Sequence, residues 1–444
     1  MPILATAALA AVLPFQAPVD SPPGWQEREL CALPEGTKLR SYGLPQVVFT
    51  DDGRAAAFVV EDSDRTALPV HAFPDRKGVV QLEIGRSHDV ILMPALTDDG
   101  TSAAFTVADD LQTARESWRV LVDGKTKLKA DHLGPPHFWP GTDELLVWTV
   151  PKGKFDEWNG VTGDHVLRRG KRSGDPWVSA LLAGPILFSK DGSSALSYAS
   201  GDEERGLLLV TPKKERLVPV PLTNSMGAGL LMALSADGKE WALEEQRVEL
   251  RQTGSSSTAV VTQVVHTPNG LVGDGFSSVR LPRFAPAGKR LAVAAQDVET
   301  ERWGGWIVDG RDPDHDFGRV TDIAWEPGDE RKVGLAFSAL EADVDDPMTV
   351  LRVMDREGRL LEGVTKWDRV RYLRVGPSGV AERDLIFTVP DGAGWRLVRE
   401  RTVAGSVQMW QSEVYTYIAP PVVDGERIGA GAVKDGALVW LAME

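Results

Sequence analysis

The chain has 444 residues, which allows two to four domains of ordinary size or one large repeat array. Hydrophobic residues make up 42% and charged residues 25%, and this globular composition excludes wholesale disorder. The formal charge of −15 makes nucleic acid an unfavourable partner, because an acidic chain repels phosphate backbones. The single cysteine, Cys31, excludes an internal disulfide and a cysteine-based zinc site.

Residues 1–23 differ in composition from the rest of the chain. Ile3 to Phe15 is a mostly apolar run, shorter than the roughly 20 residues that a spanning helix needs. Its length suits the core of a secretory signal, although no Lys or Arg precedes Arg28. The alternative is a disordered start before the Pro-rich linker Ala17 to Pro23. We expect a signal and linker in 1–23, a single domain in 24–444, and a periplasmic or secreted location, with a cytoplasmic one as the alternative.

A hairpin unit recurs along the rest of the chain: an apolar strand, an Asp-Gly turn and a second apolar strand. Four copies are VVFTDDGRAAAFVV (Val47 to Val60), PALTDDGTSAAFTV (Pro94 to Val107), PILFSKDGSSALSYA (Pro185 to Ala199) and LMALSADGKEWALE (Leu231 to Glu244). Asp-Gly between apolar runs is a strong hairpin signal, because glycine accepts positive φ without steric cost. The second strands are almost continuously apolar, which is typical of strands that are buried on both faces.

The turn glycines measure the repeat length. They are Gly53, Gly100, Gly141, Gly192, Gly238, Gly288, Gly328, Gly379 and Gly425. From first to last, 372 residues are covered in eight steps, or 46.5 per step. Repeats of roughly 40 to 50 residues are typical of β-propellers.

Each hairpin is followed by a third strand, as in Trp118 to Leu128, and by a shorter fourth one. Four antiparallel strands make one propeller blade. Two segments, FSKDGSSALSY (Phe188 to Tyr198) and VMDREG (Val353 to Gly358), resemble the repeat of the TolB-like propeller family. The resemblance covers residues 45 to 440. It implies an all-β propeller and says little about activity, because such propellers have many functions.

Ring closure is predicted from the two ends of the chain. The last repeat stops after its third strand near Leu441, and Glu29 to Ser41 precedes the first complete hairpin. We expect this N-terminal stretch to complete the last blade and so to remove the open sheet edges. Nine turn signals are present. We expect about eight blades, within a range of seven to nine, with the weak copy near Gly141 or Gly328 forming only part of a blade.

Acidic residues gather where the second strands end. Because strand direction alternates, these turns should lie on one face of the ring and give it negative potential. We predict that this face binds a basic partner, a protein or another ligand, or a cation, and we expect a protein partner; the alternative is ordinary solvated loops. The candidate binding residues are Asp62, Asp64, Asp109, Asp110, Asp202, Glu203, Asp297, Asp343 and Asp345.

A second acidic group lies in the loop Asp312, Asp314 and Asp316. Carboxylates at alternate positions can converge on calcium. The EF-hand pattern fails, because Phe317 replaces its glycine and Ile323 its glutamate. The alternative is an exposed turn. We expect no cofactor, with calcium at this loop as the one candidate.

Motifs for catalysis are not present in the sequence. It lacks Gly-x-Ser-x-Gly, His-Glu-x-x-His, a P-loop and a dinucleotide fingerprint. Its seven histidines are scattered over different repeats. We therefore predict a monomeric, non-enzymatic binding or scaffolding propeller that does not span a membrane. The alternative is an enzyme, a metal-assisted hydrolase or lyase with its site in the axial funnel.

Overall fold

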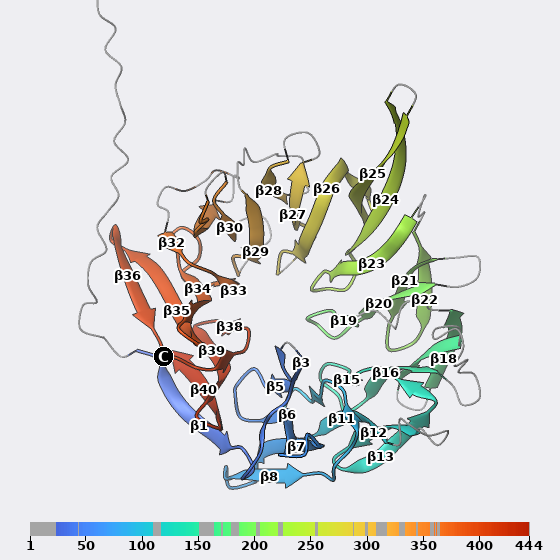
Figure 1. Cartoon of the computed structure of the whole chain (residues 1–444), viewed down its shortest axis with the longest axis vertical. Helices are drawn as coiled ribbons and strands as arrows, with labels where there is room; N and C mark the ends of the chain where they lie inside the picture. Colours follow the sequence, from blue (N-terminus) through green and yellow to red (C-terminus); the bar gives the residue numbers. More distant parts are fainter. Residues whose placement is uncertain are drawn as a thin grey trace, which may run out of the picture.

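The computed structural model is a ring of antiparallel β-sheets arranged around one axis (Figure 1). It describes residues 24–42, 44–109, 117–150, 164–169, 172–178, 186–200, 205–220, 225–253, 256–286, 288–297, 301–307, 318–327, 334–342, 345–355, 359, 361 and 365–443. These residues form strands and turns and no helix, so the predicted all-β propeller class is confirmed. Within the described ranges, no helix could cross a membrane.

The first four large sheets follow one another in chain order. The first contains β2 (Lys38–Leu39), β5 (Val47–Phe49), β6 (Ala56–Glu61), β7 (Ala67–Pro74) and β8 (Val80–Ile84). The second contains β9 (Val90–Ile91), β10 (Ala95–Leu96), β11 (Ala103–Asp109), β12 (Ser117–Val122) and β13 (Lys125–Ala130). The third contains β14 (His132–Leu133), β15 (His137–Phe138), β16 (Leu145–Val150), β17 (Asp164–Arg169) and β18 (Arg172–Val178). The fourth contains β19 (Leu187–Phe188), β20 (Ala195–Ser200), β21 (Arg205–Val210) and β22 (Glu215–Pro219).

The next sheet has six strands and joins two of the predicted repeats. Its strands are β23 (Ser225–Leu234), β24 (Trp241–Thr253), β25 (Ser256–Thr267), β26 (Gly270–Phe284), β27 (Leu291–Asp297) and β28 (Trp303–Ile307). The first half of β26 pairs with β25 and its second half with β27, so one strand closes one repeat and opens the next.

Three further sheets complete the ring. The first contains β29 (Arg319–Trp325), β30 (Leu335–Leu340), β31 (Thr349–Met354) and β32 (Thr365–Trp367). The second contains β33 (Arg371–Val375), β34 (Leu385–Asp391), β35 (Gly394–Val403) and β36 (Ser406–Gln411). The last contains β37 (Tyr417–Ile418), β38 (Val422–Asp424), β39 (Arg427–Lys434), β40 (Ala437–Met443) and β1 (Gln26–Ala32). A small separate sheet pairs β3 (Ser41–Tyr42) with β4 (Leu44–Pro45).

The nine predicted hairpins correspond to nine pairs of neighbouring strands, from β5–β6 to β38–β39. The expectation that the copy near Gly141 or Gly328 is only part of a blade is wrong. β15–β16 belongs to a five-stranded sheet and β29–β30 to a four-stranded one. The irregularity lies instead at the six-stranded sheet, which counts as one blade or as two. The described sheets therefore agree with eight or nine blades.

The N-terminal strand closes the ring. β1 pairs antiparallel with β40, from Gln26↔Ala442 to Ala32↔Ala437, so the first and last strands of the ring lie side by side (Figure 1). The predicted closure is confirmed, although its bounds are not. Residues 26–32 complete the last sheet, whereas Lys38–Leu39 pairs with β6 of the first sheet.

Apolar clusters fill the seams between neighbouring sheets. Leu30 and Leu438 of the last sheet, for example, pack with Phe58 and Val70 of the first. The second strands are the most buried part of each sheet: Phe58, Phe337 and Phe387 are all fully buried. Burial on both faces explains why these strands are apolar without alternation.

Some of the turn glycines, among them Gly53, also pack against the neighbouring sheet, and this gives a first prediction. Gly53 has φ of +65°, and a Cβ at this position would lie 2.0 Å from the indole of Trp440. Gly78 has φ of +79°, and a Cβ there would meet nothing within 4 Å. We expect Gly78→Ala to cost about 1 kcal/mol through its backbone, and Gly53→Ala to cost about 1–3 kcal/mol more through the clash. Urea unfolding measures both, and equal losses would contradict the packing.

Candidate functional site

The predicted acidic residue Asp62 caps the turn that follows β6. Its Oδ1 accepts hydrogen bonds from the backbone N–H groups of Asp64 and Thr66, each at 2.9 Å. Asp62 is half-buried and Asp64 is exposed. At least one carboxylate of the predicted binding face therefore has a structural partner in its own turn.

Asp109, at the end of β11, is the centre of an ion-pair cluster. Its carboxylate accepts from His88 Nδ1 at 2.8 Å and from Arg86 at 3.2 Å, and it also pairs with Arg119. Burial lowers the pKa of His88, while the neighbouring carboxylate opposes that shift. The charge of Asp109 is thus compensated within the protein.

Of the other predicted acidic residues, only some belong to the described part of the chain. Asp297 ends β27, and Asp345 is exposed between β30 and β31. Asp110, Asp202, Glu203 and Asp343 lie outside the described residues, as do the candidate calcium ligands Asp312, Asp314 and Asp316. No group of three His, Cys, Asp or Glu side chains able to hold a metal occurs within the described ranges. Binding by the acidic face stays a prediction.

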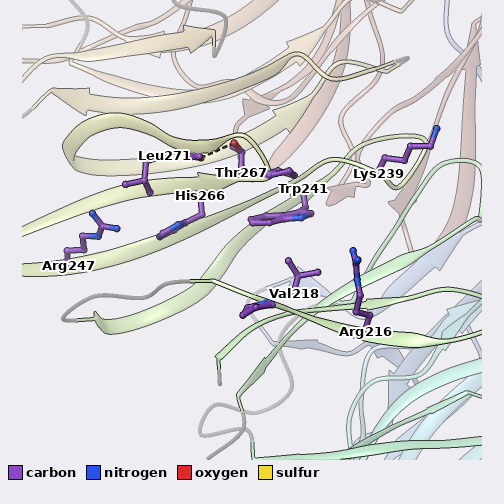
Figure 2. A pocket seen from close by; sticks show the side chains of 11 residues that line it. Arg216, Val218, Lys239, Trp241, Arg247, His266, Thr267 and Leu271 are labelled. Carbon is purple, nitrogen blue, oxygen red and sulfur yellow. Dashed lines mark hydrogen bonds between the residues drawn. The ribbon is translucent and has the colours of Figure 1, made fainter. Parts of the chain in front are cut away.

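A cavity of about 520 Å³ lies between the fourth sheet and the six-stranded sheet (Figure 2). Strand β22 forms one wall with Arg216 and Val218. The other wall is formed by Trp241 and Arg247 of β24 and by His266 of β25. We call this cavity the seam pocket.

The alternation of β24 explains which of its side chains reach the seam pocket. Trp241, Glu245 and Arg247 occupy odd positions of one strand and therefore share a face. His266 of β25 pairs directly with Leu243, which is another odd position of β24, so its side chain lies on the same face as Trp241. Trp241 and Val218 pack against the apolar cluster beneath the pocket, which keeps the indole in place.

Two exposed cations lie at the mouth of the seam pocket. Arg216 comes from β22, and Lys239 precedes β24 (Figure 2). Lys239 forms an exposed ion pair with Asp237 at 3.1 Å, a contact of little net stability. The side chain of Arg216 forms neither a hydrogen bond nor an ion pair with any described residue. These cations stand out in a protein of charge −15.

A buried carboxylate holds the two basic groups deeper in the seam pocket. The side chain of Glu245 is fully buried, and its Oε2 accepts from Arg247 Nε at 2.8 Å and contacts His266 Nε2 at 2.6 Å. With Nε2 donating to Glu245, the other ring nitrogen of His266 has no hydrogen-bond partner in the described part of the chain. The ring orientation is therefore set by the protein, while Nδ1 stays available to a ligand.

Glu244 lies on the opposite face of β24, toward the other half of the six-stranded sheet. Only 5% of this residue is exposed. Burial, followed by the charge of Glu245, raises the pKa of Glu244 to about 7. Two adjacent acidic residues thus have different roles, one a partner of cations and the other a titrating group in the core.

The arrangement suits recognition of an anion better than covalent catalysis. The Thr267 hydroxyl at the pocket wall donates to the Gly270 carbonyl at 2.9 Å, so it already has a partner. The two cations at the mouth can meet acidic oxygens. Nδ1 of His266 can accept a hydrogen bond from a ligand hydroxyl, and the indole of Trp241 offers a flat apolar surface. The seam pocket is therefore suited to an acidic ligand that has a ring.

Sequence reasoning did not identify the seam pocket. The spacing of Trp241, Glu245 and Arg247 on one strand was visible in the sequence. Their partners Arg216 and Val218, however, belong to a different repeat, and no local pattern links the two segments.

The fold and its seams define the protein as a β-propeller. The sequence matches no known family model and no curated protein. Structural similarity extends to the β-propeller domain of the Trilobed protease from Pyrococcus furiosus, at 10% identity and TM-score 0.35, covering 75% of this chain and 95% of that one. TolB from Acinetobacter baumannii has 15% identity and TM-score 0.28, with coverage of 72% and 64%. An oligogalacturonate lyase from Vibrio parahaemolyticus has 10% identity and a TM-score of 0.38, and the match covers 89% of this chain and 97% of that one.

These similarities concern the fold. A propeller fold by itself does not determine function, because one fold can carry many unrelated sites. Whether this chain binds or catalyses must be argued from its own residues.

Proposed function

We propose that this chain is a non-enzymatic binding propeller that takes an acidic, ring-containing small molecule, such as a sugar acid, in the seam pocket. The observation that carries the proposal is the combination of Trp241 with the cations Arg216 and Lys239 around one cavity. A ring can stack on the indole, and the acidic group of the same ligand can then meet the guanidinium of Arg216. The exported location predicted from residues 1–23 remains part of this proposal.

Two interactions in the seam pocket select different features of the ligand: the charged contact selects its acidic group, and stacking selects its ring. A charge-assisted hydrogen bond contributes about 1.5–3 kcal/mol, and stacking on an aromatic ring contributes a smaller amount. The charge therefore favours acids over neutral molecules, and the indole favours rings over open-chain acids.

Calorimetry with three probes tests the proposal. We expect D-glucuronate to bind, and D-glucose and acetate to bind at least tenfold more weakly, because glucose lacks the charge and acetate lacks the ring. Arg216→Ala should weaken glucuronate binding by about tenfold or more, as expected for the loss of one charged contact. Trp241→Ala should also weaken it, and added salt should weaken it further, because the cations at the mouth are exposed.

Arg76→Ala is the matched control, because Arg76 is an exposed arginine outside the seam pocket. It should leave glucuronate binding unchanged. Equal affinity for glucuronate and glucose, or equal losses in Arg76→Ala and Arg216→Ala, would show that the pocket does not recognise acids.

A further inference from the structure

The seam pocket continues beyond Trp241 along β24 and ends at Arg247. The pairing of β24 with β25 is regular from Leu243 onward, so this part of the strand is extended. At ~3.4 Å per residue, Trp241 and Arg247 are about 20 Å apart along it. The cavity volume of about 520 Å³ is in the usual range for pockets that take drug-sized ligands. A single sugar ring on the indole therefore occupies only part of the pocket.

Two further side chains line the pocket between the indole and Arg247. His266 lies between Trp241 and Arg247 (Figure 2), in agreement with its pairing opposite Leu243. Leu271 of β26 pairs with His266 from the other side, and 52% of this leucine is exposed. We call Arg247, His266 and Leu271 the deep end of the seam pocket.

Glu245 positions both polar side chains of the deep end. Its Oε2 lies 2.8 Å from Arg247 Nε and 2.6 Å from His266 Nε2, so the two groups meet at one oxygen atom. The side chain of Glu245 is fully buried, whereas that of Arg247 is 20% exposed. The Nη groups of Arg247 form no hydrogen bond with any described residue. The carboxylate therefore fixes both side chains and leaves the Nη edge of Arg247 and Nδ1 of His266 to a ligand.

The two ends of the seam pocket differ in charge. At the deep end, the negative charge of Glu245 offsets that of Arg247. At the mouth, the side chain of Arg216 has no ion pair with any described residue. The deep end thus offers a hydrogen-bond donor beside an acceptor, without net charge. This combination suits a hydroxyl group, which donates and accepts, better than a carboxylate, which only accepts.

We propose that the deep end binds the hydroxyl groups of a neutral sugar ring, so that the seam pocket takes an acidic oligosaccharide of at least two rings in one orientation. This inference rests on the proposed function, which places the acidic ring on Trp241 and its acid at Arg216. The neighbouring neutral ring then packs against Leu271, with its hydroxyl groups toward Arg247 and His266. The ligand class is a uronic acid linked to a neutral sugar.

Calorimetry of the full chain compares D-glucuronate with two disaccharides that differ in linkage order, glucuronosyl-glucose and glucosyl-glucuronate. We expect one of them to bind at least tenfold more tightly than glucuronate, because its second ring adds hydrogen bonds at the deep end. The preferred order gives the direction of the sugar chain in the pocket. Diglucuronate should bind less tightly than the preferred disaccharide, because its second carboxylate faces the charge of Glu245.

The ratio of disaccharide affinity to glucuronate affinity isolates the deep end from the mouth. Arg247→Lys keeps a charge to pair with Glu245 but removes the Nη edge, and it should bring this ratio close to one. His266→Phe keeps a ring and removes Nδ1, and it should lower the ratio severalfold even if the first variant does not fold. Arg216→Ala should weaken both ligands by the same factor and preserve the ratio. Arg76→Lys is the matched control and should change neither affinity, because Arg76 is exposed outside the seam pocket.

Failure of the proposed function and failure of this inference have different results. If glucuronate does not bind, the proposed function is wrong, and cellobiose tests the deep end alone. Cellobiose should then bind more tightly than D-glucose and lose that advantage in Arg247→Lys. A ratio near one for both linkage orders, or the same ratio in Arg247→Lys as in the native protein, would overturn the inference. Tightest binding by diglucuronate would also overturn it, because the deep end would then take an acid.

Discussion

Removal of residues 1–32 is expected to lower the free energy of unfolding by more than about 5 kcal/mol. The truncation deletes β1, which provides the outer strand of the last sheet. It exposes the edge of β40 and removes Leu30 and Cys31 from the apolar cluster between the last and first sheets. Burial of one leucine contributes about 2–3 kcal/mol, and each lost hydrogen bond adds about 1 kcal/mol. Thermal or urea unfolding measures the change.

A truncation that stops at Pro23 is the matched control, because it leaves β1 in place. Leu30→Ala is a milder variant in the intact chain and should cost about 2–5 kcal/mol by leaving a cavity. If the chains starting at 24 and at 33 have the same stability, β1 does not close the ring.

Replacement of Glu244 by Gln is expected to stabilise the protein at alkaline pH. The folded protein raises the pKa of Glu244 from 4.5 to about 7 by burial. Below pH 4.5, the group is protonated in both states and burial costs no charge. As pH rises from 4.5 to 7, the unfolded chain loses this proton more readily, so stability falls. Above pH 7, the full cost is about 3 kcal/mol.

The measurement is the stability difference between Glu244→Gln and the native protein from pH 4.5 to 8. We expect this difference to grow with pH, to about 3 kcal/mol in favour of the variant, and to level off above pH 7. Glu35→Gln is the control, because Glu35 is exposed, and its difference should stay small across the range. A difference for Glu244→Gln that does not change with pH would show that the buried group does not titrate there.

The hairpins of this protein were predictable because their signals are local. An Asp-Gly turn needs only a few adjacent residues, as in Thr50 to Gly53, where the Gly53 N–H donates to the Thr50 carbonyl at 2.9 Å. The apolar second strands were equally clear. Closure by the N-terminus also followed, because a four-stranded repeat with a missing strand requires one from elsewhere.

The division between neighbouring repeats was not predictable. β26 runs without interruption from Gly270 to Phe284 and joins two repeats into one sheet. The choice between a loop and a continuous strand depends on pairing with both β25 and β27. Such pairing is a tertiary contact, so the turn spacing alone could not fix the number of blades.

The candidate sites likewise depend on contacts between distant segments, which local sequence patterns do not predict. By itself the sequence determined the all-β class, the hairpins, the buried second strands and the closing strand, because these depend on turn chemistry and on the apolar pattern within each repeat. Only the tertiary structure placed Arg216 opposite Trp241 and paired Asp109 with His88. It also placed His266 against Glu245 of the neighbouring strand. Contacts across seams and between strands join residues through space, and a linear pattern does not record these distances.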